Sequence, residues 1–155
     1  MYVAITQKCQ YALRAVYELA LRYDEGPRKI GAVADAQGIP ARFLENILNG
    51  LKGAGFVDSA RGKDGGYYLS RRADKITVGE IIRFVQGPFD PVECIAREEP
   101  DCDIYEDCVF RPLWEKAREA LETVYDSTTV QDLVDRTHEG CGVPGCSCRR
   151  KQVSD

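Results

Sequence analysis

Residues 29–55 read KIGAVADAQGIPARFLENILNGLKGAG, and this stretch decides the fold that the sequence predicts. Its first part, residues 29–37, is short and rich in alanine. Gly38 breaks this segment, and Pro40 suits the first position of a second helix. The second helix places five apolar residues on one expected face: Phe43, Leu44, Ile47, Leu48 and Leu51. Two short helices joined by a tight turn that contains glycine predict a helix-turn-helix.

The following residues, 56–71, read FVDSARGKDGGYYLSR and predict a strand, a glycine-rich turn and a second strand. The turn carries two cations, Arg61 and Lys63. A hairpin with a basic tip after a helix-turn-helix is typical of a DNA-binding wing, in which Arg61 is placed to enter a narrow minor groove. An ordinary solvated hairpin is the alternative. A nucleotide-binding loop is disfavoured, because the spacing of Lys63 matches no P-loop and a strand follows.

Polar residues on the outward side of the second helix are expected to contact DNA. Arg42 suits guanine or phosphate, Asn46 suits adenine, and Glu45 suits cytosine, although solvated surface positions are the alternative for each. Residues 7–23 predict another helix, with Thr6 as its cap. Phosphate contacts are expected from three residues near the start of that helix: Gln7, Lys8 and Tyr11.

The net charge of −4 is unevenly distributed along the chain. Residues 1–75 contain 12 Lys and Arg against 8 Asp and Glu, a net charge of +4. Residues 76–155 contain 9 against 17, a net charge of −8. A basic N-terminal half favours a polyanionic partner, with chance variation as the alternative.

The C-terminal half predicts helices at residues 77–86, 110–125 and 129–137. The helix at residues 110–125 carries an apolar stripe that is wider than packing against one side of a small domain would bury. We therefore expect it to pair with the same helix of a second subunit, with packing inside its own chain as the alternative. The stripe consists of Leu113, Ala117, Ala120, Leu121 and Val124, widened by Trp114 and Tyr125.

Residues 94–111 read CIAREEPDCDIYEDCVFR and space Cys94, Cys102 and Cys108 as C-x7-C-x5-C among acidic residues. Thiolates hold iron–sulfur clusters, whereas structural zinc sites usually show paired C-x2-C motifs, which this loop lacks. We therefore expect this loop to bind an iron–sulfur cluster.

No run approaches about 18 apolar residues and no signal peptide is evident, so we expect a cytoplasmic protein with no membrane contact. Reduced thiols in that compartment favour metal or redox chemistry for the seven cysteines.

Four stretches together resemble the Rrf-type winged-helix transcription regulators, the group that contains IscR, NsrR and RirA. They are residues 5–21 (ITQKCQYALRAVYELAL), 39–57 (IPARFLENILNGLKGAGFV), 59–69 (SARGKDGGYYL) and 76–88 (ITVGEIIRFVQGP). The resemblance covers about residues 2–135, and the cysteine spacing is most similar to the iron-responsive RirA-like subgroup.

This resemblance implies a homodimer with an antiparallel dimerisation helix at about residues 112–126, and a cluster whose gain, loss or redox change alters DNA affinity. It also implies a minor-groove role for Arg61 and a role in site choice for Glu45. Arg111 stands where IscR-like members carry a histidine, so the fourth cluster ligand stays open. The candidates are Cys9 or Gln10 of the partner subunit, a loop carboxylate, and an exogenous thiol or water. The cluster type, 4Fe-4S or 2Fe-2S, is open as well.

The sequence thus predicts a mainly α protein with a small β-hairpin wing: a winged helix-turn-helix (1–75), a cluster loop with a dimerisation helix (76–137) and a flexible tail (138–155). The expected function is a transcription regulator, a repressor that binds a pseudo-palindromic operator in double-stranded DNA. A cluster-free regulator that uses thiol redox or a protein partner is the alternative. A protein that regulates a partner enzyme ranks lower. A metal enzyme ranks lowest, because the one histidine lies in the tail. Metal binding, oxidation and an incidental role all stay open for three tail thiols: Cys141, Cys146 and Cys148.

Overall fold

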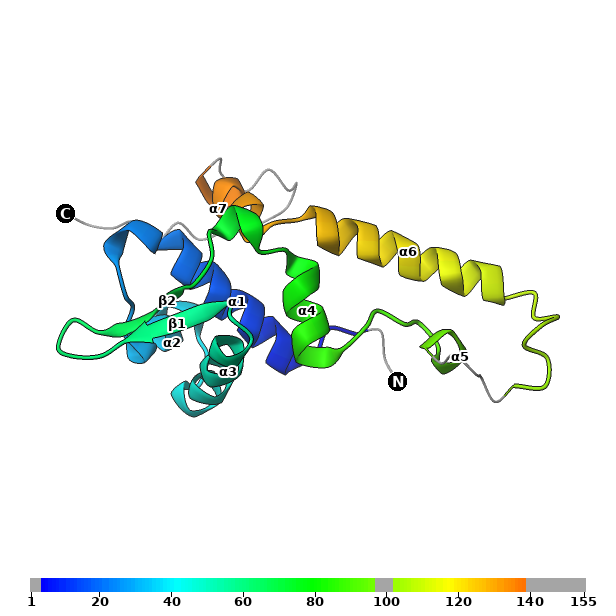
Figure 1. Cartoon of the computed structure of the whole chain (residues 1–155), viewed down its shortest axis with the longest axis horizontal. Helices are drawn as coiled ribbons and strands as arrows, with labels where there is room; N and C mark the ends of the chain where they lie inside the picture. Colours follow the sequence, from blue (N-terminus) through cyan, green and yellow to red (C-terminus); the bar gives the residue numbers. More distant parts are fainter. Residues whose placement is uncertain (1–3, 97–101, 139–155) are drawn as a thin grey trace.

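The computed structural model describes residues 4–96 and 102–138 as a helical head from which one long helix extends (Figure 1). The head contains most of the helices and one antiparallel two-stranded sheet. The elements in chain order are α1 (Gln7–Leu21), α2 (Ile30–Gln37), α3 (Ala41–Gly53), β1 (Val57–Ala60), β2 (Gly66–Leu69), α4 (Val78–Gln86), α5 (Glu93–Ala96), α6 (Arg111–Ser127) and α7 (Val130–His138). Two short 3-10 helices lie at Tyr23–Glu25 and Ala73–Lys75. This architecture confirms the predicted fold class.

Side-chain caps determine where several helices begin. Thr6 accepts a hydrogen bond from the Cys9 amide at 3.2 Å, which starts α1 at the predicted residue. Thr77 and Glu80 form a reciprocal capping box at the start of α4. At α7, Thr129 and Asp132 exchange hydrogen bonds in the same way. These caps satisfy amide groups that have no partner inside the helix.

The helix-turn-helix consists of α2 and α3, and Gly38 joins them in a left-handed conformation with φ +62°. The core-facing side of α3 consists of Leu44, Ile47, Leu48 and Leu51, all buried. The sequence prediction was wrong on one member of this face, because the Phe43 side chain is 62% exposed. Pro40 also lies one residue earlier than expected, since it precedes the first helical residue.

The wing is the β1–β2 hairpin, in which Val57 pairs with Leu69 and Ala60 with Gly66. It is fastened to the head by Arg28, whose backbone exchanges two hydrogen bonds of 2.8 Å with Tyr67. A Cβ atom at Gly66 would lie 2.3 Å from the Arg28 carbonyl oxygen, so this close approach requires glycine. The base of the wing therefore has a fixed position on the head.

A buried carboxylate lies beneath this attachment. Glu18 of α1 is 2% exposed and is the one buried charged residue among residues 4–96 and 102–137. Its oxygens accept hydrogen bonds from Arg28 at 3.1 Å and from the Gln37 side chain at 2.8 Å. Glu18 thus joins α1 to the end of α2 and to the strand-like segment that holds the wing.

Helix α6 leaves the head, and none of its residues is buried. Near its C-terminal end, Asp126 accepts two hydrogen bonds from Arg83 of α4, at 2.7 and 2.6 Å. The Tyr125 ring lies 5.0 Å from the Phe89 ring, between centroids. Toward the other end the helix extends away from the head, with α5 beside it (Figure 1). Within the described parts of the chain, no helix is long and apolar enough to cross a membrane.

Replacing Glu18 with alanine is expected to lower the free energy of unfolding by about 3 kcal/mol, because Arg28 loses its buried partner. Glu25→Ala is the matched control: Glu25 also pairs with Arg28, at 3.5 Å, but its side chain is 50% exposed. The control should change stability by less than about 1 kcal/mol. Urea denaturation of both variants measures the difference, and equal losses would contradict the central role of Glu18.

Candidate DNA-binding surface and cysteine loop

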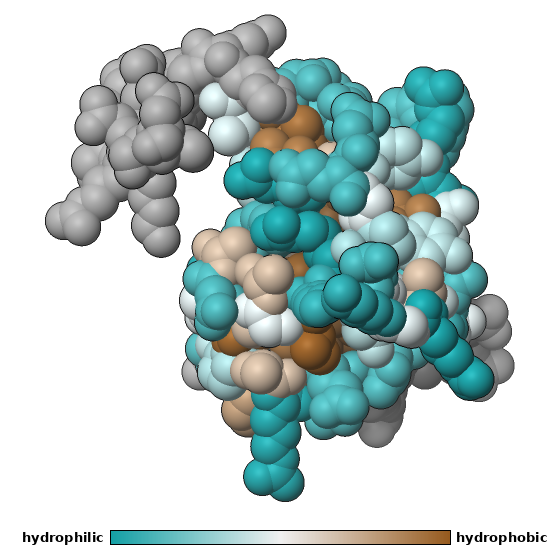
Figure 2. Space-filling view, turned by 90° about the vertical axis from the view of Figure 1, so that its left-hand side faces the viewer, coloured by the Kyte–Doolittle hydropathy of each residue, from teal (hydrophilic) through white to brown (hydrophobic). Residues whose placement is uncertain are grey.

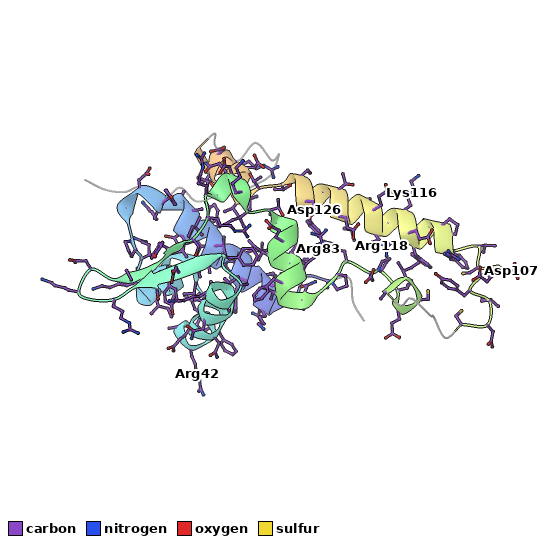
Figure 3. The ribbon with its side chains drawn as sticks, viewed as in Figure 1. Arg42, Arg83, Asp107, Lys116, Arg118 and Asp126 are labelled. Atoms are coloured by element: carbon purple, nitrogen blue, oxygen red, sulfur yellow. The ribbon has the colours of Figure 1, made fainter. Side chains whose placement is uncertain are left out.

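Helix α3 presents a polar side to solvent because its apolar residues turn toward the core. Arg42, Glu45, Asn46 and Asn49 are all exposed on this helix. Arg42 lies near the start of α3 and points away from the body of the molecule (Figure 3). The described structure therefore brings together the three residues of this helix that the sequence proposed as base contacts.

The wing tip, residues 61–65, extends from the head at the opposite end from α6 (Figure 1). Arg61 and Lys63 are both exposed on it. A Cβ atom at Gly65 would lie 2.3 Å from the Ala60 carbonyl oxygen, so the tight turn at the tip also depends on glycine. The end of the molecule that carries the tip is mostly hydrophilic (Figure 2). Such a tip is suited to entering a groove of a polyanion.

Three side-chain contacts join the wing to α3. The Tyr67 hydroxyl donates a hydrogen bond to the Asn49 Oδ1 atom at 3.3 Å. Lys52 contacts Asp58 at 2.9 Å and donates to the Ser59 hydroxyl at 2.6 Å, and its hydrogen bond holds the pKa of Asp58 below the usual value. Residue spacing does not predict these contacts, because it does not show which strand residue faces which helix residue.

The third predicted group lies at the start of α1, a helix that packs against both α3 and α4. Gln7 and Lys8 are exposed and Tyr11 is half-buried. The Gln7 side-chain amide donates to the Tyr11 hydroxyl at 2.8 Å. These residues share one helix end, but no contact joins them to Arg61 or Lys63 in the described structure.

The three loop cysteines lie between α4 and α6. Cys94 belongs to α5 and is half-buried, Cys102 is exposed, and Cys108 is half-buried shortly before α6. Residues 97–101 of this loop lie outside the described residues, as do the tail thiols Cys141, Cys146 and Cys148. Across residues 4–96 and 102–138, no three His, Cys, Asp or Glu side chains are gathered closely enough to hold a metal.

The chemistry of the loop side chains nevertheless fits an iron–sulfur cluster, because the loop supplies three free thiols that solvent reaches.

The two proposed ligands on α1 differ sharply. Cys9 is fully buried beside Val78, Ile82 and Phe89, and burial raises the pKa of its thiol to about 11. Gln10 is exposed, and its side-chain amide donates to the Ile5 carbonyl oxygen at 3.0 Å. A buried, protonated thiol is poorly placed to ligate a group held by another chain.

Arg111 occupies the position where related proteins with an IscR-like pattern carry a histidine. Its side chain forms an ion pair with Glu115 at 3.0 Å and lies over the Tyr105 ring, 4.4 Å from the centroid. The guanidinium therefore ties the end of the cysteine loop to the first turns of α6 and supplies no ligand.

Comparison with known proteins places these features among transcription regulators. The Rrf2 family profile, described as "Iron-dependent Transcriptional regulator", matches residues 5–136. The HTH-type transcriptional regulator CymR of Bacillus subtilis is 39% identical over 133 residues, covering 86% of this chain and 91% of CymR. The solved structure of CymR, named the global cysteine regulator of B. subtilis, aligns with a TM-score of 0.72 and 36% identity over 85% of this chain and 96% of its own. The solved structure of T. potens IscR also aligns with a TM-score of 0.72, at 32% identity over 88% of this chain and 89% of its own.

Replacing Arg61 with alanine is expected to weaken binding to an operator duplex about tenfold and to reduce the salt dependence of binding, because one phosphate or minor-groove contact is lost. Lys116→Ala is the control: Lys116 is also exposed but lies on α6, far from Arg42 (Figure 3). Fluorescence anisotropy at several salt concentrations measures both effects. Equal affinity of the Arg61 and Lys116 variants would contradict the assignment of the wing.

Iodoacetamide should modify Cys102 much faster than Cys9 in the reduced, metal-free protein near neutral pH. Cys9 is buried and, with a pKa of about 11, almost wholly protonated at that pH, so its thiolate fraction stays low until the pH approaches 11. Time-resolved peptide mass spectrometry measures both rates. Denaturation should abolish the difference, whereas equal rates in the native protein would show that Cys9 is not buried in solution.

Proposed function

The chain belongs to the Rrf2 family of transcriptional regulators, and from this we propose that it is a homodimeric repressor whose affinity for its operator depends on an iron–sulfur cluster. Regulators of this family bind DNA and are not enzymes, and the winged helix of this chain has the form that such binding requires. The observation that carries the proposal is the joint presentation of α3 and the wing tip, with Arg42 and Arg61 exposed on them.

The proposed DNA complex places α3 in a major groove and the wing tip in the adjacent minor groove. Arg42, Glu45 and Asn46 lie on the exposed side of α3 and supply donors and acceptors for base edges. Arg61 and Lys63 supply positive charge at the tip, and Gln7, Lys8 and Tyr11 are the proposed phosphate contacts. The contacts that join α3 to the wing, such as Tyr67 with Asn49, support a fixed spacing between the two readers.

The proposed dimer forms through α6. Leu113 and Val124 are 54% and 58% exposed, and the helix buries none of its residues within its own chain. Leu121 and Tyr125 pack against the head, but an amphipathic helix that leaves part of its apolar side uncovered gains stability by pairing with a copy of itself. The symmetry of such a dimer would match a pseudo-palindromic operator whose half-sites lie one helical turn, or a multiple of it, apart.

Cys94, Cys102 and Cys108 are the proposed cluster ligands, and the exposed Gln10 of the partner subunit suits the fourth position better than the buried Cys9 does. A bound cluster of the 4Fe-4S or 2Fe-2S type would supply sensitivity to iron, nitric oxide or redox state. A change at the cluster would reach α6 through Arg118, because the Arg118 guanidinium contacts Asp90 at 3.5 Å and the Ile95 carbonyl oxygen at 3.4 Å. A coupling of about 1–3 kcal/mol would give roughly 5- to 150-fold regulation.

A cluster-free regulator that senses through its thiols is the second candidate. Two observations favour it: the similarity to CymR, whose name refers to cysteine and not to iron, and the spread arrangement of the cysteines in the described residues. In this case Cys102, the exposed thiol of the described part of the loop, would be the first to be oxidised. The two candidates share the DNA-binding surface and differ in what the loop binds.

Replacing Cys102 with alanine should abolish iron and acid-labile sulfide in anaerobically purified protein, together with its visible absorption bands. Cys9→Ala is the matched control and should keep both, because Cys9 lies in the core of the head. Iron and sulfide are counted per chain alongside the spectrum. Full iron and sulfide in the Cys102 variant would refute the ligand assignment. A wild-type protein that stays colourless after reconstitution, with DNA binding that responds to thiol oxidation, would establish the cluster-free regulator instead.

A further inference from the structure

Phe43 is an aromatic side chain on the DNA-facing helix that the core does not use. It is the third residue of α3 and is 62% exposed, although its neighbour Leu44 is fully buried. Leu44, Leu48 and Leu51 already fill the core side of this helix. The packing of the head thus leaves the Phe43 ring free to contact a partner.

The side of α3 on which Phe43 lies can be identified. Phe43 and Gly50 are seven residues apart, two turns of one helix, and therefore lie on the same side. A Cβ atom at Gly50 would lie 4.0 Å from the Phe84 ring of α4, whereas Asn49 contacts Tyr67 of the wing. Phe43 thus flanks the polar row of α3 on the side away from the wing.

We propose that Phe43 is a specificity-determining residue that contacts the 5-methyl group of a thymine in the major groove of the operator. The inference rests on the proposed function, because it requires α3 to lie in that groove. In a helix-turn-helix, the N-terminal residues of the second helix contact base edges, and Phe43 belongs to the first turn of α3. Phenylalanine is among the residues that recognise the thymine methyl group by apolar contact.

The surroundings of Phe43 favour DNA over a protein partner. Its neighbours on the exposed side are Arg42 and Asn46, a cation and an amide that suit phosphate and base edges. An aromatic ring beside such groups adds discrimination that hydrogen bonds alone do not supply, since thymine and cytosine differ in the major groove by this methyl group as well as by their polar atoms.

The test compares thymidine with deoxyuridine, whose base lacks only the 5-methyl group. A duplex is first selected from a random pool with the wild-type protein, and each thymine is then replaced singly by deoxyuridine. At one thymine in each half-site, the replacement should weaken wild-type binding about fourfold, the value of one buried methyl group. Phe43→Ala should bind the thymine and deoxyuridine duplexes equally at that position, while its thermal unfolding stays unchanged.

Two control variants separate this role from others. Phe84→Ala removes an aromatic side chain that is 47% exposed on α4 and should keep the discrimination between thymine and deoxyuridine. Arg42→Ala should lower affinity for both duplexes and keep the discrimination too. Fluorescence anisotropy measures every pair of duplexes.

Two results would overturn the role of Phe43 and leave DNA binding intact: no thymine position that responds in the wild type, or full discrimination retained in Phe43→Ala. Failure of the wild type to select any duplex would instead overturn the proposed operator binding, and this inference with it.

Discussion

The ion pair between the buried carboxylate of Glu18 and the partly exposed Arg28 is the interaction on which the geometry of the head depends. A carboxylate that is 2% exposed must be compensated, and its partners come from two other segments: Arg28 before α2 and Gln37 at the end of α2. The backbone of Arg28 in turn pairs with Tyr67 of the wing. One charge therefore sets the relative positions of α1, α2 and β2. A surface that must match two DNA grooves at once needs this kind of fixed spacing.

Helix α6 is joined to that head mainly through its C-terminal half. Arg83 and Asp126 connect α4 to the C-terminal end of α6, and the Arg83 guanidinium also lies 4.9 Å from the centroid of the Phe89 ring. Near the middle of α6, Arg118 contacts the start of the cysteine loop, and at its N-terminal end Arg111 contacts the end of that loop. A change in the loop thus acts on a helix that is anchored to the head mainly at one end. This arrangement suits a regulator in which a distant site adjusts the position of a rigid reading head.

Local chemistry made most of the elements predictable. Thr6 caps α1 as the sequence predicts, Gly38 makes the expected turn, and α4 and α7 begin one residue after their predicted starts, because Thr77 and Thr129 cap them. The candidate site was less predictable. Helical spacing alone placed Phe43 with the core residues, because Phe43 lies at the edge of the apolar side of α3. Periodicity shows where that side is centred but does not show how much of it is buried. Packing against α1, α2 and β1 buries one side of α3 and leaves Phe43, at the edge of that side, to solvent.

By itself, the sequence determined the helix-turn-helix, the wing with Arg61 at its tip, and the membership of a regulator family, since caps, turns and motifs act over a few residues. Only the tertiary structure decided that Cys9 is buried, that Phe43 is exposed and that Tyr67 joins the wing to α3. These properties arise from contacts between segments far apart in the chain. Burial and side-chain pairing depend on which surfaces meet after folding, and residue spacing along one segment does not show which surfaces these are.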